Sequence, residues 1–212
     1  SKGLNFTRIY PGAYLERGVD FYAGNPLAPR DGRQILPWAQ TAVTGANAVL
    51  GGHKFDLDAW NEDYFTRLRD FCAKASDRGI VVEICLFNGM YENRWPYQAM
   101  QAQNNIQGVG TCSWDMVQSL TADTRLLSYQ QKYVTEITRR LNDFDNLLFH
   151  VCDEPNMSKQ SPEVYGPWVS RLIDVFKTAE SALPKKHLLG QTVSFAMRSN
   201  ACDFSADSRI QY

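Results

Sequence analysis

The chain has 212 residues, a formal net charge of -1 and 44% hydrophobic residues. This length and composition fit one globular domain over residues 1–212 with a sizeable core. The balanced charge gives no reason to expect nucleic acid or an anionic membrane as a partner. No apolar run approaches the roughly 20 residues that a membrane helix needs.

The cysteines indicate a reduced protein without a zinc site. Their number is odd, they have no C-x-x-C spacing, and several lie in apolar segments where a free thiol behaves as a small core residue. They are Cys72, Cys85, Cys112, Cys152 and Cys202. Since no histidine lies at ligand spacing from a cysteine pair, we expect no metal and no cofactor. Reduced cysteines favour a soluble, cytoplasmic protein.

The first half of the chain reads as a strand, a helix and a second strand. Residues 4–10 (LNFTRIY) predict the first strand, and a long loop rich in glycine, proline and aromatic residues follows. Apolar residues at helical spacing predict a helix over 60–78, with Asp58 as its cap and Gly79 as its end. The apolar run 80–87 (IVVEICLF) predicts the next strand.

The second half continues the alternation without a linker that would separate two domains. The predicted elements are a loop over 88–120, a helix over 126–141, a strand over 147–153, a helix from Ser161 to 179, a strand over 187–193 and a last strand over 202–212. Strands that alternate with helices predict a parallel sheet and right-handed crossovers. The fold class is therefore α/β.

Two adjacent carboxylates, Asp153 and Glu154, end the apolar run LLFHVC, and Pro155 stops the strand there. The carboxyl ends of interior parallel strands are where α/β folds place their chemistry. A solvated turn is the simplest alternative for such a pair. A carboxyl at the mouth of an apolar barrel would be poorly solvated, which would raise its pKa into the range of a general acid.

The segment FHVCDEPN resembles the fourth-strand signature of the large retaining (β/α)8 glycoside hydrolase clan, the cellulase-like families. GLNFTRIY is similar to the second strand of the clan, and residues 58–87 are similar to the following helix and third strand. The resemblance implies a parallel TIM-barrel-like fold and a carbohydrate substrate, and it also allows secretion.

The same resemblance assigns roles to three residues. Glu154 takes the acid/base position, and Arg8 takes the position of an active-site arginine, although Arg8 could equally be a partner of a structural carboxylate. Asp153 stands where the family usually has asparagine, and it cannot donate to a sugar hydroxyl as an amide does. Arg8 would offset the added negative charge if it reaches Asp153.

The resemblance covers only about five of the eight βα units of a complete barrel. No residue stands at the position of the family's nucleophile: Glu83 lies inside a strand, and Glu92 lies in a loop. We therefore expect an incomplete barrel. Because open edges and an exposed apolar interior favour association, we also expect a homo-oligomer that covers them.

Polar and aromatic residues after the strands are candidates for sugar binding, with the anchoring of loops as the alternative. The candidate substrate-binding residues are Arg8, Asn88, Trp95, Tyr97, Trp114 and Asn156. Tyr14, Trp38 and His53 lie in the same loops.

Three hypotheses follow. The first is a retaining glycoside hydrolase acting on β-linked poly- or oligosaccharides, with Glu154 as acid/base and Asp153 beside it. The second is a catalytically silent carbohydrate-binding or scaffold domain with the same fold. The third is a metal-dependent hydrolase using His150, Asp153 and Glu154, for which no second histidine is placed to join.

Overall fold

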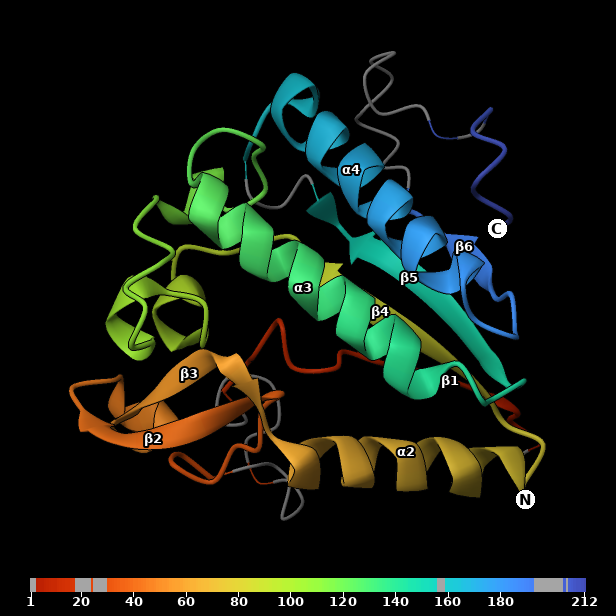
Figure 1. Cartoon of the computed structure of the whole chain (residues 1–212), viewed down its shortest axis with the longest axis horizontal. Coiled ribbons are helices and arrows are strands. Elements are labelled where there is room, and N and C mark those ends of the chain that lie inside the picture. The colour runs from red at the N-terminus through yellow and green to blue at the C-terminus, as the bar shows by residue number, and fades with distance from the viewer. Residues whose placement is uncertain (1–2, 18–23, 25–29, 156–158, 193–203, 205) are drawn as a thin grey trace.

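The centre of the computed structural model is a four-stranded parallel sheet (Figure 1). The structure describes residues 3–17, 24, 30–155, 159–192, 204 and 206–212. The strand order is β1-β4-β5-β6, with β1 at Phe6–Ile9, β4 at Val81–Asn88, β5 at Leu147–Asp153 and β6 at Leu188–Gly190. Each of these strands lies in a segment that the sequence predicted as a strand, so the parallel α/β class is confirmed.

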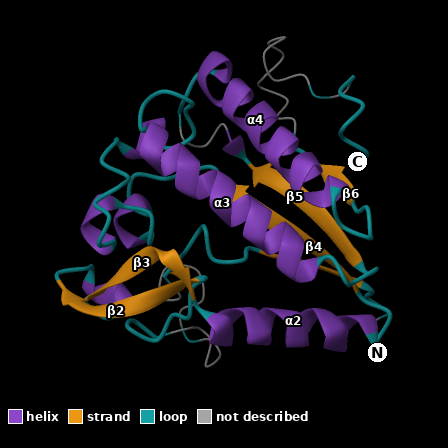
Figure 2. Ribbon diagram, in the orientation of Figure 1, coloured by secondary structure: helices purple, strands orange, loops and turns teal. Residues whose placement is uncertain are grey.

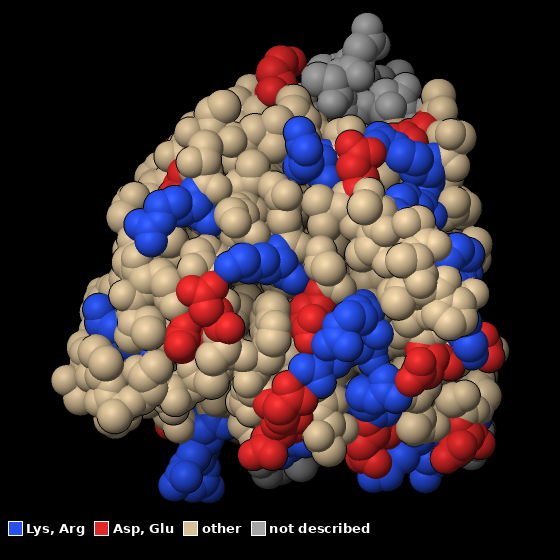
Figure 3. All heavy atoms as spheres, in the orientation of Figure 1, with Lys and Arg blue, Asp and Glu red and all other residues tan. Residues whose placement is uncertain are grey.

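In the described part of the chain, three α-helices connect the strands and cover the sheet (Figure 2). They are α2 (Glu62–Ser76), α3 (Thr124–Leu141) and α4 (Pro162–Ser181). Helices α3 and α4 lie side by side across one face of the sheet, where Phe149 of β5 packs on Phe176 of α4 with ring centroids 4.9 Å apart. Their outer surface carries acidic and basic side chains next to one another (Figure 3), as the balanced net charge requires.

The start of α2 differs from the prediction. The Asn61 side chain accepts a hydrogen bond from the Tyr64 N–H and caps the helix, so the predicted cap Asp58 and the predicted first residue Trp60 are wrong. Both belong to strand β3 (His53–Trp60) instead. Beyond the other end of the helix, Gly79 adopts a φ of 66°, a conformation that glycine reaches without strain.

An antiparallel hairpin occupies a segment that the sequence predicted as loop. Strand β2 (Trp38–Thr44) pairs with β3, and Trp38 lies opposite Trp60. Trp38 also contacts Tyr133 of α3, with ring centroids 5.6 Å apart. The prediction failed because β2 is largely solvent-exposed, the pairing is irregular in register, and the apolar alternation of β3 is short, with Phe55 and Leu57 as its buried residues.

The predicted last strand over 202–212 is wrong for its described part, since residues 204 and 206–212 form no strand. Gln211 nevertheless lies along β6. Its N–H donates to the Leu189 carbonyl over 2.9 Å, and its side-chain oxygen accepts from the Leu189 N–H over 2.9 Å. Cys202 lies outside the described residues, while Cys72, Cys85, Cys112 and Cys152 are free thiols, as predicted.

The sheet does not close into a barrel within the described part of the chain. Beside β1, at one edge of the sheet, Leu4 is 81% exposed, Phe6 53% and Phe71 of α2 41%. Association of copies over this apolar edge stays a prediction. No described helix has an apolar stretch long enough for a bilayer span.

Candidate functional site at the carboxyl ends of the strands

A network of charged and polar side chains joins β1, β4 and β5 with Thr192, which follows β6. We call it the charge network and define it as Arg8, Glu83, His150, Asp153 and Thr192. The parallel register places Arg8 of β1 opposite Glu83 of β4, and Asn88 at the end of β4 opposite Asp153 at the end of β5. Strand alternation turns Arg8, Glu83 and His150 toward the same face, and Asp153 joins them at the end of β5 through its contacts with Arg8 and Thr192.

Arg8 bridges two carboxylates. Its Nε donates to Glu83 Oε2 over 2.5 Å, and its Nη1 donates to Asp153 Oδ2 over 2.8 Å. The hydrogen bond to Glu83, with the negative charge of Asp153, raises the pKa of Arg8 above its usual value. The sequence left two roles open for Arg8, as an active-site arginine or as the partner of a structural carboxylate. The structure shows its contacts with Glu83 and with Asp153, whose charge it offsets, and the active-site role stays a prediction.

Asp153 accepts hydrogen bonds from three side chains. Besides Arg8, the Tyr10 hydroxyl donates to Oδ2 over 2.7 Å and the Thr192 hydroxyl donates to Oδ1 over 3.0 Å. Burial alone would raise the pKa of Asp153, but the hydrogen bond from Tyr10, the charge of Arg8 and the hydrogen bond from Thr192 lower it below its usual value. Asp153 is therefore a fixed carboxylate at neutral pH.

His150 is a neutral member of the charge network. Its Nε2 accepts from the Thr192 N–H over 3.0 Å, so the ring proton lies on Nδ1, which faces Glu83 Oε1 at 3.1 Å without the alignment of a hydrogen bond. Burial lowers the pKa of His150, against the opposing charge of Glu83. The metal hypothesis relied on His150, but the described residues contain no group of three metal-ligating side chains.

Tyr212 packs against the charge network from the direction of β6. Its hydroxyl donates to the Phe149 carbonyl over 2.9 Å, and its ring lies so close to Gly190 that a side chain there would meet it at 2.6 Å. Glycine at this position of β6 therefore lets Tyr212 lie over the sheet.

Glu154 follows the fixed Asp153 in sequence but is exposed to solvent. Its φ of 45° is left-handed, a conformation that is strained for a residue other than glycine, and Pro155 follows directly. The expectation that Glu154 lies in a dry hollow is wrong in this structure. The sheet is open beyond β1 and β6, so nothing in the described part of the chain encloses the strand ends.

Among the described residues, the hydrogen-bond partner of the Glu154 side chain is the Tyr91 hydroxyl, which donates to Oε2 over 3.3 Å. Burial and the nearby Glu154 charge raise the pKa of Tyr91 to about 12, so this hydroxyl remains a donor at neutral pH. Tyr91 belongs to a row of three rings. The centroids of Tyr10 and Tyr14 are 6.2 Å apart, and those of Tyr14 and Tyr91 are 6.5 Å apart.

The loop residues predicted to bind substrate differ in accessibility. Trp95 is buried, 6% exposed, and its indole N–H donates to the Cys112 carbonyl, which fits the loop-anchoring alternative. Tyr97 and Trp114 are partly exposed, and each carries a cation over its ring, from Arg17 and Lys159 respectively.

Two amide side chains were also predicted to bind substrate. Asn88 lies at the end of β4, next to Asp153, and its buried Oδ1 has no hydrogen-bond partner in the described part of the chain. Asn156 lies outside the described residues.

Several members of the site were not predicted as site residues from the sequence. Tyr10 and Tyr91 follow predicted strands, but nothing in the sequence distinguishes them from loop aromatics. Thr192 reaches Asp153 only through the pairing of β5 with β6. Glu83 did carry a signal, because a lone carboxylate inside the apolar run IVVEICLF needs a buried partner.

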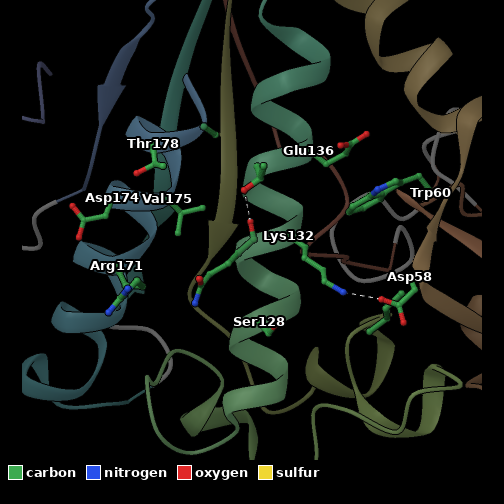
Figure 4. Close-up of a pocket in the computed structure, with 13 residues that line it drawn as sticks. Asp58, Trp60, Ser128, Lys132, Glu136, Arg171, Asp174, Val175 and Thr178 are labelled. Carbon is green, nitrogen blue, oxygen red and sulfur yellow. Dashed lines mark hydrogen bonds and ion pairs between the residues drawn. The ribbon is translucent and has the colours of Figure 1, made fainter. Parts of the chain in front are cut away.

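A separate hollow lies between β3, α3 and α4 (Figure 4). It has a volume of about 750 Å³ and lies on the helical side of the sheet, away from the charge network. Lys132 and Asp58 form an ion pair across it, with Nζ and Oδ1 2.8 Å apart. The size of this hollow is no evidence of function by itself. The charge of Lys132 is already paired with Asp58, so it offers no unpaired cation to a ligand.

Comparison with known proteins gives matches in structure only. No family model and no curated protein matches the sequence. A "putative glycoside hydrolase" from Bacteroides vulgatus is similar with a TM-score of 0.56 and 15% identity, over 89% of this chain and 29% of that one. An endo-beta-1,4-mannanase from Thermotoga petrophila has a TM-score of 0.47 and 18% identity, over 89% and 36%. GH5_18 from Streptomyces cattleya, in complex with GlcNAc, has a TM-score of 0.45 and 19% identity, over 64% and 32%.

The chain spans less than two fifths of the length of each of these three proteins. Only the Bacteroides protein is similar enough to support an argument, and at this identity the argument concerns the fold. Together with the parallel four-stranded sheet, this similarity shows that the chain has an incomplete TIM-barrel-like fold, similar to part of that protein.

Proposed function

We propose that this domain is a glycoside hydrolase acting on β-linked poly- or oligosaccharides, with Glu154 as the acid/base residue of a retaining mechanism. The observation that carries the proposal is the difference in hydrogen bonding between two adjacent carboxylates. Among the described residues, Asp153 is held by three side-chain donors, whereas Glu154 accepts from one hydroxyl and has no ion-pair partner. The fold supports the proposal, since Glu154 follows an interior strand at its carboxyl end.

Glycoside cleavage requires a carboxylic acid that delivers its proton to the leaving oxygen and later takes a proton from water. A residue in this role must be reachable by substrate and water, and no ion pair with another described residue occupies the Glu154 carboxyl. The Tyr91 hydroxyl positions the Glu154 carboxyl through the one hydrogen bond that it receives. The proposal concerns this half of the mechanism and assigns no nucleophile.

Asp153 contributes a fixed negative charge rather than a proton. A fixed carboxylate next to the reacting carbon favours the positive charge that develops on the sugar in the transition state. It also accepts, and cannot donate, hydrogen bonds, so a sugar hydroxyl that contacts Asp153 acts as the donor. Trp114 and Tyr97 are partly exposed rings that can contact further sugar units.

The test is hydrolysis of aryl β-glycosides by the wild type, Glu154→Gln and Glu92→Gln. Glu92 is an exposed glutamate of the loop after β4 and serves as the matched control. Loss of a general acid lowers the rate by about 10²–10⁴-fold, so we expect this loss for Glu154→Gln only. With Glu154→Ala and an activated leaving group, added azide is expected to restore turnover and give a β-glycosyl azide.

A second candidate function, carbohydrate binding without turnover, is favoured by the exposure of Glu154, since an acid/base carboxyl usually works in a desolvated site. Equal rates for the wild type and Glu154→Gln would remove Glu154 from catalysis. Binding of oligosaccharide without product release would then establish the binding function.

A further inference from the structure

We propose that a pocket beside Tyr10 is a subsite for a sugar unit that carries an anionic group, a carboxylate or a sulfate ester. The pocket has a volume of about 480 Å³ and is lined by three segments: residues 10–15 after β1, residues 33–36 before β2, and the first half of α2. The inference deepens the proposed function, on which it rests for the rest of the substrate.

The pocket adjoins the charge network through Tyr10. The Tyr10 ring lines the pocket, while its hydroxyl donates to Asp153. Gly12 brings the other two segments close to residues 10–15. It has a φ of 88°, and a side chain at this position would meet the Pro37 ring at 2.4 Å. A sugar in this pocket would therefore lie next to the unit held at Asp153 and Glu154.

Two arginines of the pocket lack acidic partners. Arg33 and Arg67 line it, and neither forms a hydrogen bond or ion pair through its guanidinium with any described residue. No described residue that lines the pocket is acidic. Most other described arginines are paired with carboxylates, namely Arg8, Arg17, Arg69, Arg94, Arg139, Arg140 and Arg209. Two like charges lining one pocket repel each other, and a bound anion would relieve that repulsion.

The remaining lining suits a sugar ring. Tyr10 and Tyr64 provide aromatic surface, and Tyr10 is 38% exposed. Gln34 also lines the pocket, and its Oε1 has no hydrogen-bond partner in the described structure, so a turn of this side chain toward a bound sugar would supply an acceptor without breaking a hydrogen bond of that oxygen. Guanidinium groups bind carboxylate and sulfate through paired N–H donors, which a neutral hydroxymethyl group cannot match. The combination of aromatic walls, one acceptor and two unpaired guanidiniums favours an anionic sugar over a neutral one.

The experiment is a binding titration followed by NMR, with methyl β-D-glucuronide and methyl β-D-glucoside, which differ only in the group at C6. We expect the wild type to bind the glucuronide about tenfold more tightly, as a charge-assisted hydrogen bond allows. Arg33→Gln and Arg67→Gln are each expected to remove most of this preference. Arg171→Gln, which removes an arginine of the α3–α4 hollow, is the matched control and is expected to keep it.

Equal affinity for the two sugars, failure to bind either, or a preference that survives both pocket substitutions would overturn the proposal. The same titration with glucose 6-sulfate identifies the anionic group. If glucose 6-sulfate binds more tightly than the glucuronide, the subsite takes a sulfate ester; if it binds more weakly, the subsite takes a uronate. The titration needs no turnover and is repeated with Glu154→Gln. Tighter binding of the glucuronide without hydrolysis of aryl β-glycosides would therefore contradict only the proposed function. Hydrolysis without tighter binding of the glucuronide would contradict only the subsite.

Discussion

Two neighbouring regions at the carboxyl ends of the strands differ in whether their charged side chains have partners of opposite charge. In the charge network every ionised group has a partner: Arg8 lies between Glu83 and Asp153, and Asp153 has two further donors. In the second region, which we call the rim and define as Glu154, Tyr91, Arg33 and Arg67, the charges are exposed and have no partner of opposite charge in the described structure.

The difference separates groups that hold the sheet together from groups that are free to act on a ligand. A paired, buried charge contributes to a unique arrangement of strands, and removing one partner leaves the other uncompensated. An unpaired charge at the surface contributes little to folding, because water already solvates it. Substitutions in the charge network should therefore change stability, and substitutions in the rim should change only binding or turnover.

The largest effect on stability is expected for Glu83→Ala. Glu83 is 2% exposed, and its removal leaves Arg8 and His150 without their shared partner. Breaking a buried ion pair costs about 3–5 kcal/mol, which chemical denaturation would measure as a lower free energy of unfolding. Glu62→Ala is the control, because Glu62 pairs with Arg140 at an exposed position where about 0–1 kcal/mol is expected. Similar losses for the two variants would show that the charge network does not hold the strands.

A smaller, pH-dependent effect is expected for His150→Gln. Burial lowers the pKa of His150 in the folded state. Below its usual pKa of about 6.5 the unfolded chain binds a proton that the folded chain resists, so the stability of the wild type falls as the pH decreases through this range. His150→Gln should remove this part of the pH dependence between about pH 7 and pH 5. Parallel pH profiles for the two proteins would mean that His150 is not held neutral.

The sequence was most informative where a segment is buried on both sides. The runs IVVEICLF and LLFHVC predicted β4 and β5, and apolar periodicity predicted α3 and α4, because burial imposes a composition that can be read locally. The hairpin β2–β3 escaped prediction because β2 is largely exposed, the apolar alternation of β3 is short, and Trp38 packs on a distant partner, Tyr133.

The site was predictable in part. The position of Asp153 and Glu154 at a strand end followed from the apolar run and from Pro155. The contacts of Asp153 with Tyr10 and Thr192 depend on strand register, which no local pattern specifies. The exposure of Glu154 depends on its left-handed backbone and on an open sheet, neither of which the sequence showed.

The most direct test of the contrast between the two regions is a carboxyl NMR titration that follows Asp153 in the wild type and in Thr192→Val. We predict a pKa below the usual value of 3.8 for Asp153 in the wild type, and a higher pKa when the hydroxyl donor of Thr192 is removed. Because the folded-state pKa is lowered, the stability that Asp153 contributes is present above this value and is lost as the pH falls through the folded pKa. A wild-type pKa at or above 3.8 would contradict the account, since the charge network would then not hold Asp153 in the carboxylate form.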